Sequence, residues 1–188
     1  MTPEPLIPPH GGYRELKSYQ MAEIIYDATV VFCGRFIEKR SRTNDQMVQA
    51  ARSGKQNIAQ GSMASGTSKK TELKLIGVAR ASLEELLLDF EDFLRQKGLP
   101  LWPKEHAKAK EVRAIAWKEN RSYSTYKCYF ESSDAETAAN TAICVIHQAN
   151  FLLDQQLRAL EKGFLEEGGF TERLYRVRSQ AREKTRKK

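Results

Sequence analysis

Apolar residues recur at intervals of mostly three to five along much of the chain, the spacing of one face of an α-helix. From 13 to 38 the recurring positions are Leu16, Tyr19, Ile24, Ala28, Val31 and Phe36. From 69 to 97 the repeat is heptad-like and comprises Leu73, Ile76, Ala79, Leu83, Leu86, Leu87, Phe90, Phe93 and Leu94. From about 135 to 167 it comprises Ala139, Ala142, Ile146, Leu153, Leu157, Leu160 and Phe164. These three stretches are predicted to form long amphipathic helices.

Between the first two of these helices, the chain keeps helical spacing but presents small residues. Met47, Ala50, Gly54, Ile58 and Gly61 share one face, and Asn57 lies beside it. Because glycine inside a helix costs about 1 kcal/mol relative to alanine, the two glycines predict close approach of a neighbouring helix, within the subunit or between subunits. The alternative is a helix weakened or broken at Gly54. Asn57 needs a polar partner there. The predicted helix-packing or oligomer interface comprises Ala50, Gly54, Asn57, Ile58 and Gly61.

Polar residues mark where these helices begin and end. Asn44 or Asp45 is the predicted N-cap of the second helix, and Ser68 that of the third. The sequence 133–136 has the pattern of a capping box that opens the last long helix. The diglycine at 168–169 is predicted to end that helix.

Two short segments interrupt or follow the long helices. A shorter helix is predicted over 104–119. The aromatic-rich segment 120–133 is predicted to be an ordered loop packed on the helices, with an RNA-stacking surface as the alternative because tyrosines and basic residues interleave there.

Residues 1–12, which include four prolines, are predicted to be a disordered lead-in, 13–168 the helical domain and 169–188 a basic tail.

The charge is concentrated in that tail. Of the net charge of +7, residues 170–188 carry +6, with eight basic against two acidic residues. The tail is predicted to bind nucleic-acid phosphates through Arg173, Arg176, Arg178, Arg182, Lys184, Arg186, Lys187 and Lys188. Spacing of Phe170, Leu174 and Val177 also favours a short amphipathic helix. The alternative is a solvated end that aids solubility.

Metal, cofactor and membrane sites are not predicted. Cys33, Cys128 and Cys144 include no close pair, which favours buried free thiols. Cys144 and His147 share a helix face, but two ligands are too few for zinc. No histidine follows a glutamate by three residues, as in di-iron bundles, and no nucleotide-binding or hydrolase motif occurs. No apolar run approaches the roughly 18 residues that span a bilayer, and the first residues are unlike a signal peptide. The sequence thus predicts a cytoplasmic protein that is not an enzyme and has no cofactor or membrane partner.

Two motifs carry a resemblance to a known family. The first is DQMVQAARSGKQNIAQG at 45–61 and the second is ARASLEEL at 79–86. Together they resemble the bacterial four-helix bundle family of 23S rRNA intervening-sequence proteins, whose hallmark residues correspond here to Gln46, Ala50, Ala51, Ser53, the run 57–61 and the run 79–86. The chain departs from the pattern at Gln60, where the family usually has glutamate, and at Lys55, where proline is common.

This resemblance implies an up-down antiparallel four-helix bundle, with an inserted short helix within 104–132 and a C-terminal helical suffix. It also implies a homo-oligomeric ring, with a pentamer as the first expectation. A relative, the accessory protein of diversity-generating retroelements, binds nucleic acid and a reverse transcriptase. The expected function is therefore a non-catalytic oligomer that binds RNA or DNA through the basic tail. The alternative is a protein-interaction scaffold or an accessory subunit of a nucleic-acid enzyme such as a reverse transcriptase.

Overall fold

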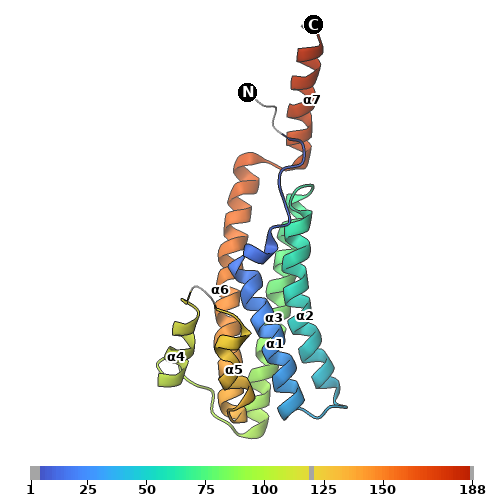
Figure 1. Cartoon of the computed structure of the whole chain (residues 1–188). Coiled ribbons are helices and arrows are strands. Elements are labelled where there is room, and N and C mark those ends of the chain that lie inside the picture. The colour runs from blue at the N-terminus through green and yellow to red at the C-terminus, as the bar shows by residue number, and fades with distance from the viewer. Residues whose placement is uncertain (1–4, 119–120, 187–188) are drawn as a thin grey trace.

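Helices dominate the fold. The computed structural model describes residues 5–118 and 121–186, and these ranges contain no β-strand, so the predicted all-α class is confirmed. The elements in chain order are the 3-10 turn η1 (Tyr13–Glu15), α1 (Lys17–Phe36), α2 (Arg42–Ala64), α3 (Lys69–Lys97), α4 (Ala107–Ile115), α5 (Tyr123–Glu131), α6 (Ala135–Glu167) and α7 (Phe170–Arg186). Figure 1 shows α1, α2, α3 and α6 side by side along the molecule, α4 and α5 beside its lower part, and α7 projecting from its upper end.

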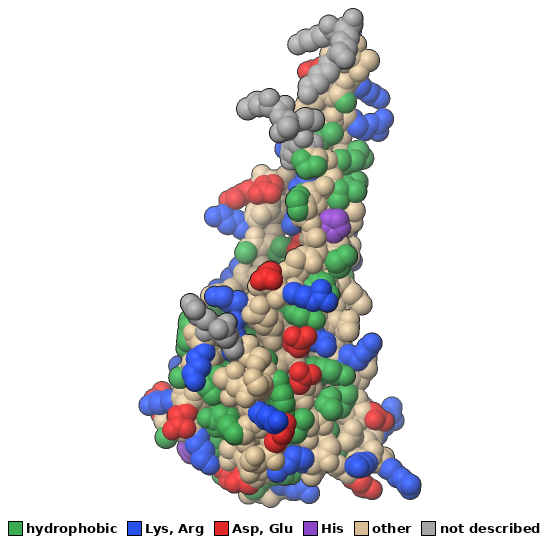
Figure 2. Space-filling model, in the orientation of Figure 1, with side chains coloured by type: hydrophobic (Ala, Val, Ile, Leu, Met, Phe, Trp, Pro, Cys, Tyr) green, Lys and Arg blue, Asp and Glu red, His purple; other side chains and the backbone are tan. Residues whose placement is uncertain are grey.

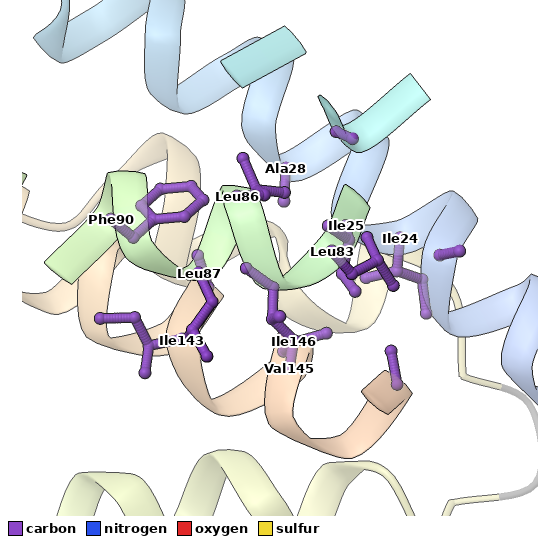
Figure 3. Close-up of a cluster of buried hydrophobic side chains, with 14 of the residues drawn as sticks. Ile24, Ile25, Ala28, Leu83, Leu86, Leu87, Phe90, Ile143, Val145 and Ile146 are labelled. Atoms are coloured by element: carbon purple, nitrogen blue, oxygen red, sulfur yellow. The ribbon is translucent and has the colours of Figure 1, made fainter. Parts of the chain in front are cut away.

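The core lies between the inward faces of α1, α2, α3 and α6. Figure 3 shows the side chains that α1, α3 and α6 direct into it, among them Ile24, Ile25, Ala28, Leu83, Leu86, Leu87, Phe90, Ile143, Val145 and Ile146. Phe32 packs edge-on against Phe90 and Phe93, with ring centroids 4.8 and 4.9 Å apart. Every residue of the predicted 69–97 repeat except Leu73 is buried. Since burying one large apolar side chain contributes about 1.5–3 kcal/mol, this repeat is a principal source of stability.

The starts of α1 and α2 differ from the prediction. The first helix is not continuous from residue 13, because Leu16 is extended (ψ 123°) between η1 and α1. The N-cap of α2 is Ser41, whose hydroxyl accepts a hydrogen bond from the Thr43 N–H at 3.2 Å. The predicted caps, Asn44 and Asp45, therefore lie inside the first turn, and this prediction is wrong.

α3 begins after the predicted N-cap and ends at a glycine. Ser68 accepts a hydrogen bond from the Thr71 N–H at 3.1 Å, as an N-cap does. Gly98 follows the helix with φ 63°, a left-handed conformation that favours glycine. These two residues fix the length of the helix that carries the core repeat.

The predicted capping box at 133–136 is wrong, although α6 begins there. Asp134 is the N-cap, and its carboxylate accepts a hydrogen bond from the Thr137 N–H at 2.7 Å. The Glu136 carboxylate accepts instead from the indole N–H of Trp102 at 2.9 Å. Glu136 thus holds the α3–α4 connection against α6 rather than closing the helix end.

The aromatic segment forms a helix and not the predicted loop. α5 begins after Ser122, whose backbone N–H donates to the Thr125 hydroxyl at 3.2 Å in a reciprocal capping arrangement. Tyr126 and Phe130 are four residues apart and fully buried, which favours the packing interpretation and leaves neither ring available to stack on a base. The preceding α4 (Ala107–Ile115) is shorter at both ends than the predicted 104–119.

The structure describes residues 5–12 of the predicted lead-in. They contain no helix and lie against the end of α2. The Gly11 N–H donates a hydrogen bond to the Ser62 carbonyl at 3.2 Å. A Cβ atom on Gly66 would lie only 2.8 Å from the His10 ring. The segment therefore contacts the α2–α3 turn closely, at the end of the molecule from which α7 projects (Figure 1).

Candidate nucleic-acid interface

The small face of α2 packs against α3 within the same chain. Gly54 and Gly61 are both buried, and α2 is continuous through each of them. A Cβ atom on Gly54 would lie 2.6 Å from Cδ2 of Leu83, and one on Gly61 would lie 3.4 Å from the Glu72 carbonyl oxygen. Ala50 and Ile58, also on this face, are buried as well. The glycines therefore permit close helix approach inside the subunit, as predicted, and the alternative of a helix broken at Gly54 does not occur.

Asn57 has the polar partners that its position requires. Its Nδ2 donates to the Ser53 carbonyl at 2.9 Å and lies 3.1 Å from the Ser53 hydroxyl. The same hydroxyl is 2.9 Å from that of Ser82 on α3. Since Ser53 and Ser82 belong to the two sequence motifs, these motifs meet across the α2–α3 interface, where they have a packing role.

A second polar cluster joins α3 to α6. Arg80 contacts the carboxylates of Glu84 at 2.6 Å and Asp154 at 3.2 Å. Asn150 donates to the same Glu84 carboxylate at 3.1 Å. These contacts make α3 and α6 antiparallel neighbours. Because every charged member has a partner of opposite sign, the cluster fixes the register of two helices and does not present a reactive group.

A cavity of about 330 Å³ lies between α1 and the start of α5; it is lined by Gln20, Glu23, Ile24, Asp27, Arg121, Ser122, Tyr123 and Ser124. Burial raises the pKa of Asp27. The positive charge of Lys55 lowers this pKa, and the negative charge of Glu23 raises it further. Burial and the neighbouring Glu131 raise the pKa of Tyr123 to about 12. The lining combines two carboxylates, three hydroxyl groups and a guanidinium, and it includes no cysteine or histidine.

The thiols are less uniformly buried than predicted. Cys33 is buried, and burial followed by the nearby Asp89 charge raises its pKa to about 12. Cys144 is half-buried, whereas Cys128 is exposed on α5, so the prediction is wrong for Cys128. Among the described residues, no three histidine, cysteine or acidic side chains come together as potential metal ligands.

The basic tail forms α7, which begins with a polar cap at the diglycine. Gly168 has φ 72°, and the Gly169 N–H donates to the Glu172 carboxylate at 2.8 Å. Backbone N–H groups of Glu172 and Gly169 lower the pKa of this carboxyl. The glycines redirect the chain after α6, and α7 leaves the upper end of the molecule (Figure 1).

α7 has an apolar side and two separate basic sides. Phe170, Leu174 and Val177 are half-buried and share one face. At 100° per residue, Arg178, Arg182 and Arg186 follow one another on one side of this face, at intervals of one turn, and all three are exposed. The other predicted contacts of the described helix, Arg173 and Arg176, lie on the opposite side of the apolar face, half-buried and exposed respectively.

The predicted nucleic-acid residues are thus only partly brought together. Lys187, Lys188 and the side chain of Lys184 lie outside the described residues. Figure 2 shows basic side chains on the outer surface of α7, whereas basic and acidic side chains are interspersed over the bundle below. Tyr175, which is not among the residues predicted from the sequence, is exposed and lies one turn before the arginine row. Its spacing from Arg178 and Arg182, three and seven residues, is the signal that identifies it.

Comparisons with protein-family models, with curated proteins and with solved structures find no match to this chain. The resemblance to the 23S rRNA intervening-sequence family therefore stays a prediction from the two motifs. Within 5–118 and 121–186, no helix combines the length and apolar character needed to cross a bilayer. The surface of α7 remains the candidate functional site.

Proposed function

We propose that this protein is a non-catalytic homo-oligomer that binds the backbone of RNA or DNA through α7. The single observation that carries the proposal is the row of exposed arginines, Arg178, Arg182 and Arg186, on a helix that projects beyond the bundle. We further propose that α1, α2, α3 and α6 form an up-down antiparallel bundle of the 23S rRNA intervening-sequence type, in a cytoplasmic protein.

The charge distribution supports binding through α7 rather than through the bundle. Residues 170–188 carry +6 of the net +7, so the remaining 169 residues are close to neutral. Guanidinium groups form charge-assisted hydrogen bonds with phosphate oxygens and release condensed counterions on binding. An oligomer would present several copies of α7, which raises affinity by multivalency without further contacts.

Oligomerisation must use a surface other than the small face of α2, because that face is already packed on α3. The outer sides of α3 and α6 expose Val78, Leu88 and Phe151. The contacts of Glu84 with Asn150 and of Arg80 with Asp154 set the register, which places Leu88 and Phe151 within about two helical turns of each other. We propose these exposed apolar side chains as the contact between subunits.

Binding is tested with a labelled structured RNA and a labelled duplex DNA across a salt series. We compare the full chain, a chain ending at Gly168 and a variant with Arg178, Arg182 and Arg186 changed to Gln. Loss of three phosphate contacts should reduce the magnitude of the salt slope by up to about 3 for duplex DNA. The matched control changes three exposed lysines on the bundle, Lys70, Lys74 and Lys97, to Gln.

The outcome separates the proposal from its alternatives. Weak binding by both α7 variants, with the lysine control equal to the unmodified chain, supports α7 as the interface. Equal binding and equal salt slopes in all four proteins would refute it. Absence of binding by the unmodified chain at low salt would favour the scaffold or accessory-subunit alternative, which the exposed apolar side chains of Leu165 on α6 and Met63 on α2 support.

The oligomer is tested by light scattering after size exclusion. A pentamer has five times the 21.5 kDa mass of one chain. Phe151→Glu should lower the measured mass, because it places a charge in the proposed contact, whereas Lys74→Gln on the bundle surface should not. A monomeric mass for the unmodified protein at micromolar concentration contradicts this part of the proposal.

A further inference from the structure

Tyr175 is an exposed aromatic residue within the basic side of α7. Its side chain is 77% exposed, although large aromatic rings are usually at least half covered in folded proteins. At 100° per residue, Tyr175, Arg178, Arg182 and Arg186 occupy an arc of about 80° and a length of about 17 Å. The α7 acids, Glu172 and Glu183, lie outside this arc. The arc is therefore a continuous basic surface with one ring at its bundle-proximal end.

Helix packing does not account for the position of this ring. The apolar face of α7, formed by Phe170, Leu174 and Val177, is centred about 130° from Tyr175. Those three side chains are half-buried, while Tyr175 is exposed. The residues one turn before and one turn after it, Thr171 and Ser179, are polar. Tyr175 thus belongs to the arginine side of the helix and contributes nothing to the packing side.

We propose that the arginine side of α7 binds single-stranded nucleic acid, with the Tyr175 ring stacked on an unpaired base and Arg178, Arg182 and Arg186 on the adjoining phosphates. This inference rests on the proposed function of α7 and adds the class of nucleic acid. Stacked aromatic rings and a basic track are the combination that binds single strands without sequence preference. A duplex hides the faces of its bases, so it offers the arginines phosphates but offers Tyr175 no partner.

The test measures binding of a labelled oligouridine of about twelve nucleotides and of a duplex DNA of equal length, by fluorescence anisotropy with the full chain. The variants are Tyr175→Ala and Tyr175→Phe. We expect Tyr175→Ala to weaken oligouridine binding by about 5- to 150-fold, the range observed for loss of one base stack. Duplex binding and both salt slopes should be unchanged, because no phosphate contact is lost. Tyr175→Phe keeps the ring and should bind like the unmodified chain.

Two controls test whether the effect is specific to the Tyr175 ring. Trp117→Ala removes another exposed aromatic, 87% exposed, from outside α7 and should leave binding unchanged. Circular dichroism checks that α7 persists in Tyr175→Ala, which is expected because alanine favours a helix more than tyrosine does.

Specific results would overturn the inference. It is wrong if Tyr175→Ala binds oligouridine as tightly as the unmodified chain, or if it weakens duplex and single strand equally. It is also wrong if the unmodified chain prefers the duplex. In each of these cases a salt-dependent affinity that is lost on truncation at Gly168 leaves the proposed function standing. Both proposals are removed by an absence of all binding at low salt, or by binding that truncation at Gly168 leaves unchanged.

Discussion

Replacing Gly54 by alanine tests whether the small face of α2 exists for close packing. The added Cβ would lie 2.6 Å from Cδ2 and 2.8 Å from Cγ of Leu83, which is fully buried. Overpacking of this kind costs about 1–3 kcal/mol. Alanine in a helix returns about 1 kcal/mol relative to glycine. The expected net effect is a loss of about 0–2 kcal/mol in the free energy of unfolding.

Gly77→Ala is the matched control for this substitution. Gly77 is also inside a helix, α3, and a Cβ atom there meets no other atom within 4 Å. It should therefore gain the helix-propensity benefit of about 1 kcal/mol without a packing cost. The difference between the two variants, about 1–3 kcal/mol, isolates the cost of crowding Leu83.

Urea unfolding measures both free energies, with equal m-values required for the comparison. All variants are studied at one protein concentration, since stability depends on concentration in an oligomer. In a double-mutant cycle, Leu83→Ala should be less destabilising when Gly54 is already alanine, by more than about 0.5 kcal/mol. The close-packing argument is refuted if Gly54→Ala raises the free energy of unfolding as much as Gly77→Ala does and shows no coupling to Leu83→Ala.

Two further predictions concern a helix cap and a thiol. Asp134→Ala should reduce the free energy of unfolding by about 0.5–2 kcal/mol at neutral pH, measured by urea unfolding, because α6 loses its N-cap. Hydrogen bonds from Thr137 lower the pKa of Asp134, so this contribution is present above the unfolded-state pKa and should disappear as the pH falls through the folded-state pKa. In a thiol-reagent assay, Cys128 should react fastest and Cys33 only on unfolding, because Cys128 is exposed whereas Cys33 is buried with its pKa raised to about 12; equal rates contradict this.

Long-range periodicity predicted the helices that build the core. The repeat over 69–97 sums the preference of many positions, so no single residue decides it, and its buried set agrees with the structure. Helix ends depend on one or two local hydrogen bonds, for which several residues compete. Ser41, Asn44 and Asp45 are all good caps, and only the fold shows that the Ser41 hydroxyl accepts the Thr43 N–H.

The sequence could not predict α5 because its stability comes from tertiary contacts. The helix has only nine residues and is rich in Tyr, Ser and Thr, which have moderate helix propensity. Isolated helices of this length are marginal in water. Burial of Tyr126 and Phe130 against the long helices supplies the missing free energy, and that contact depends on residues far away in the chain.

The candidate interface was predictable in charge but not in geometry. Composition locates the basic residues in the tail, yet a flexible tail and a helix have the same net charge. The helix places the basic residues of the tail on two sides. Arg178, Arg182 and Arg186 lie on one side with Tyr175, and Arg173 lies on the other side of the apolar face. This division gives α7 an orientation, because a strand of nucleic acid on the Tyr175 side reaches Arg173 only across the apolar face or across the side that carries Glu172 and Glu183. A charge change at Arg182 and one at Arg173 are therefore distinct experiments, which a purely electrostatic tail would make equivalent.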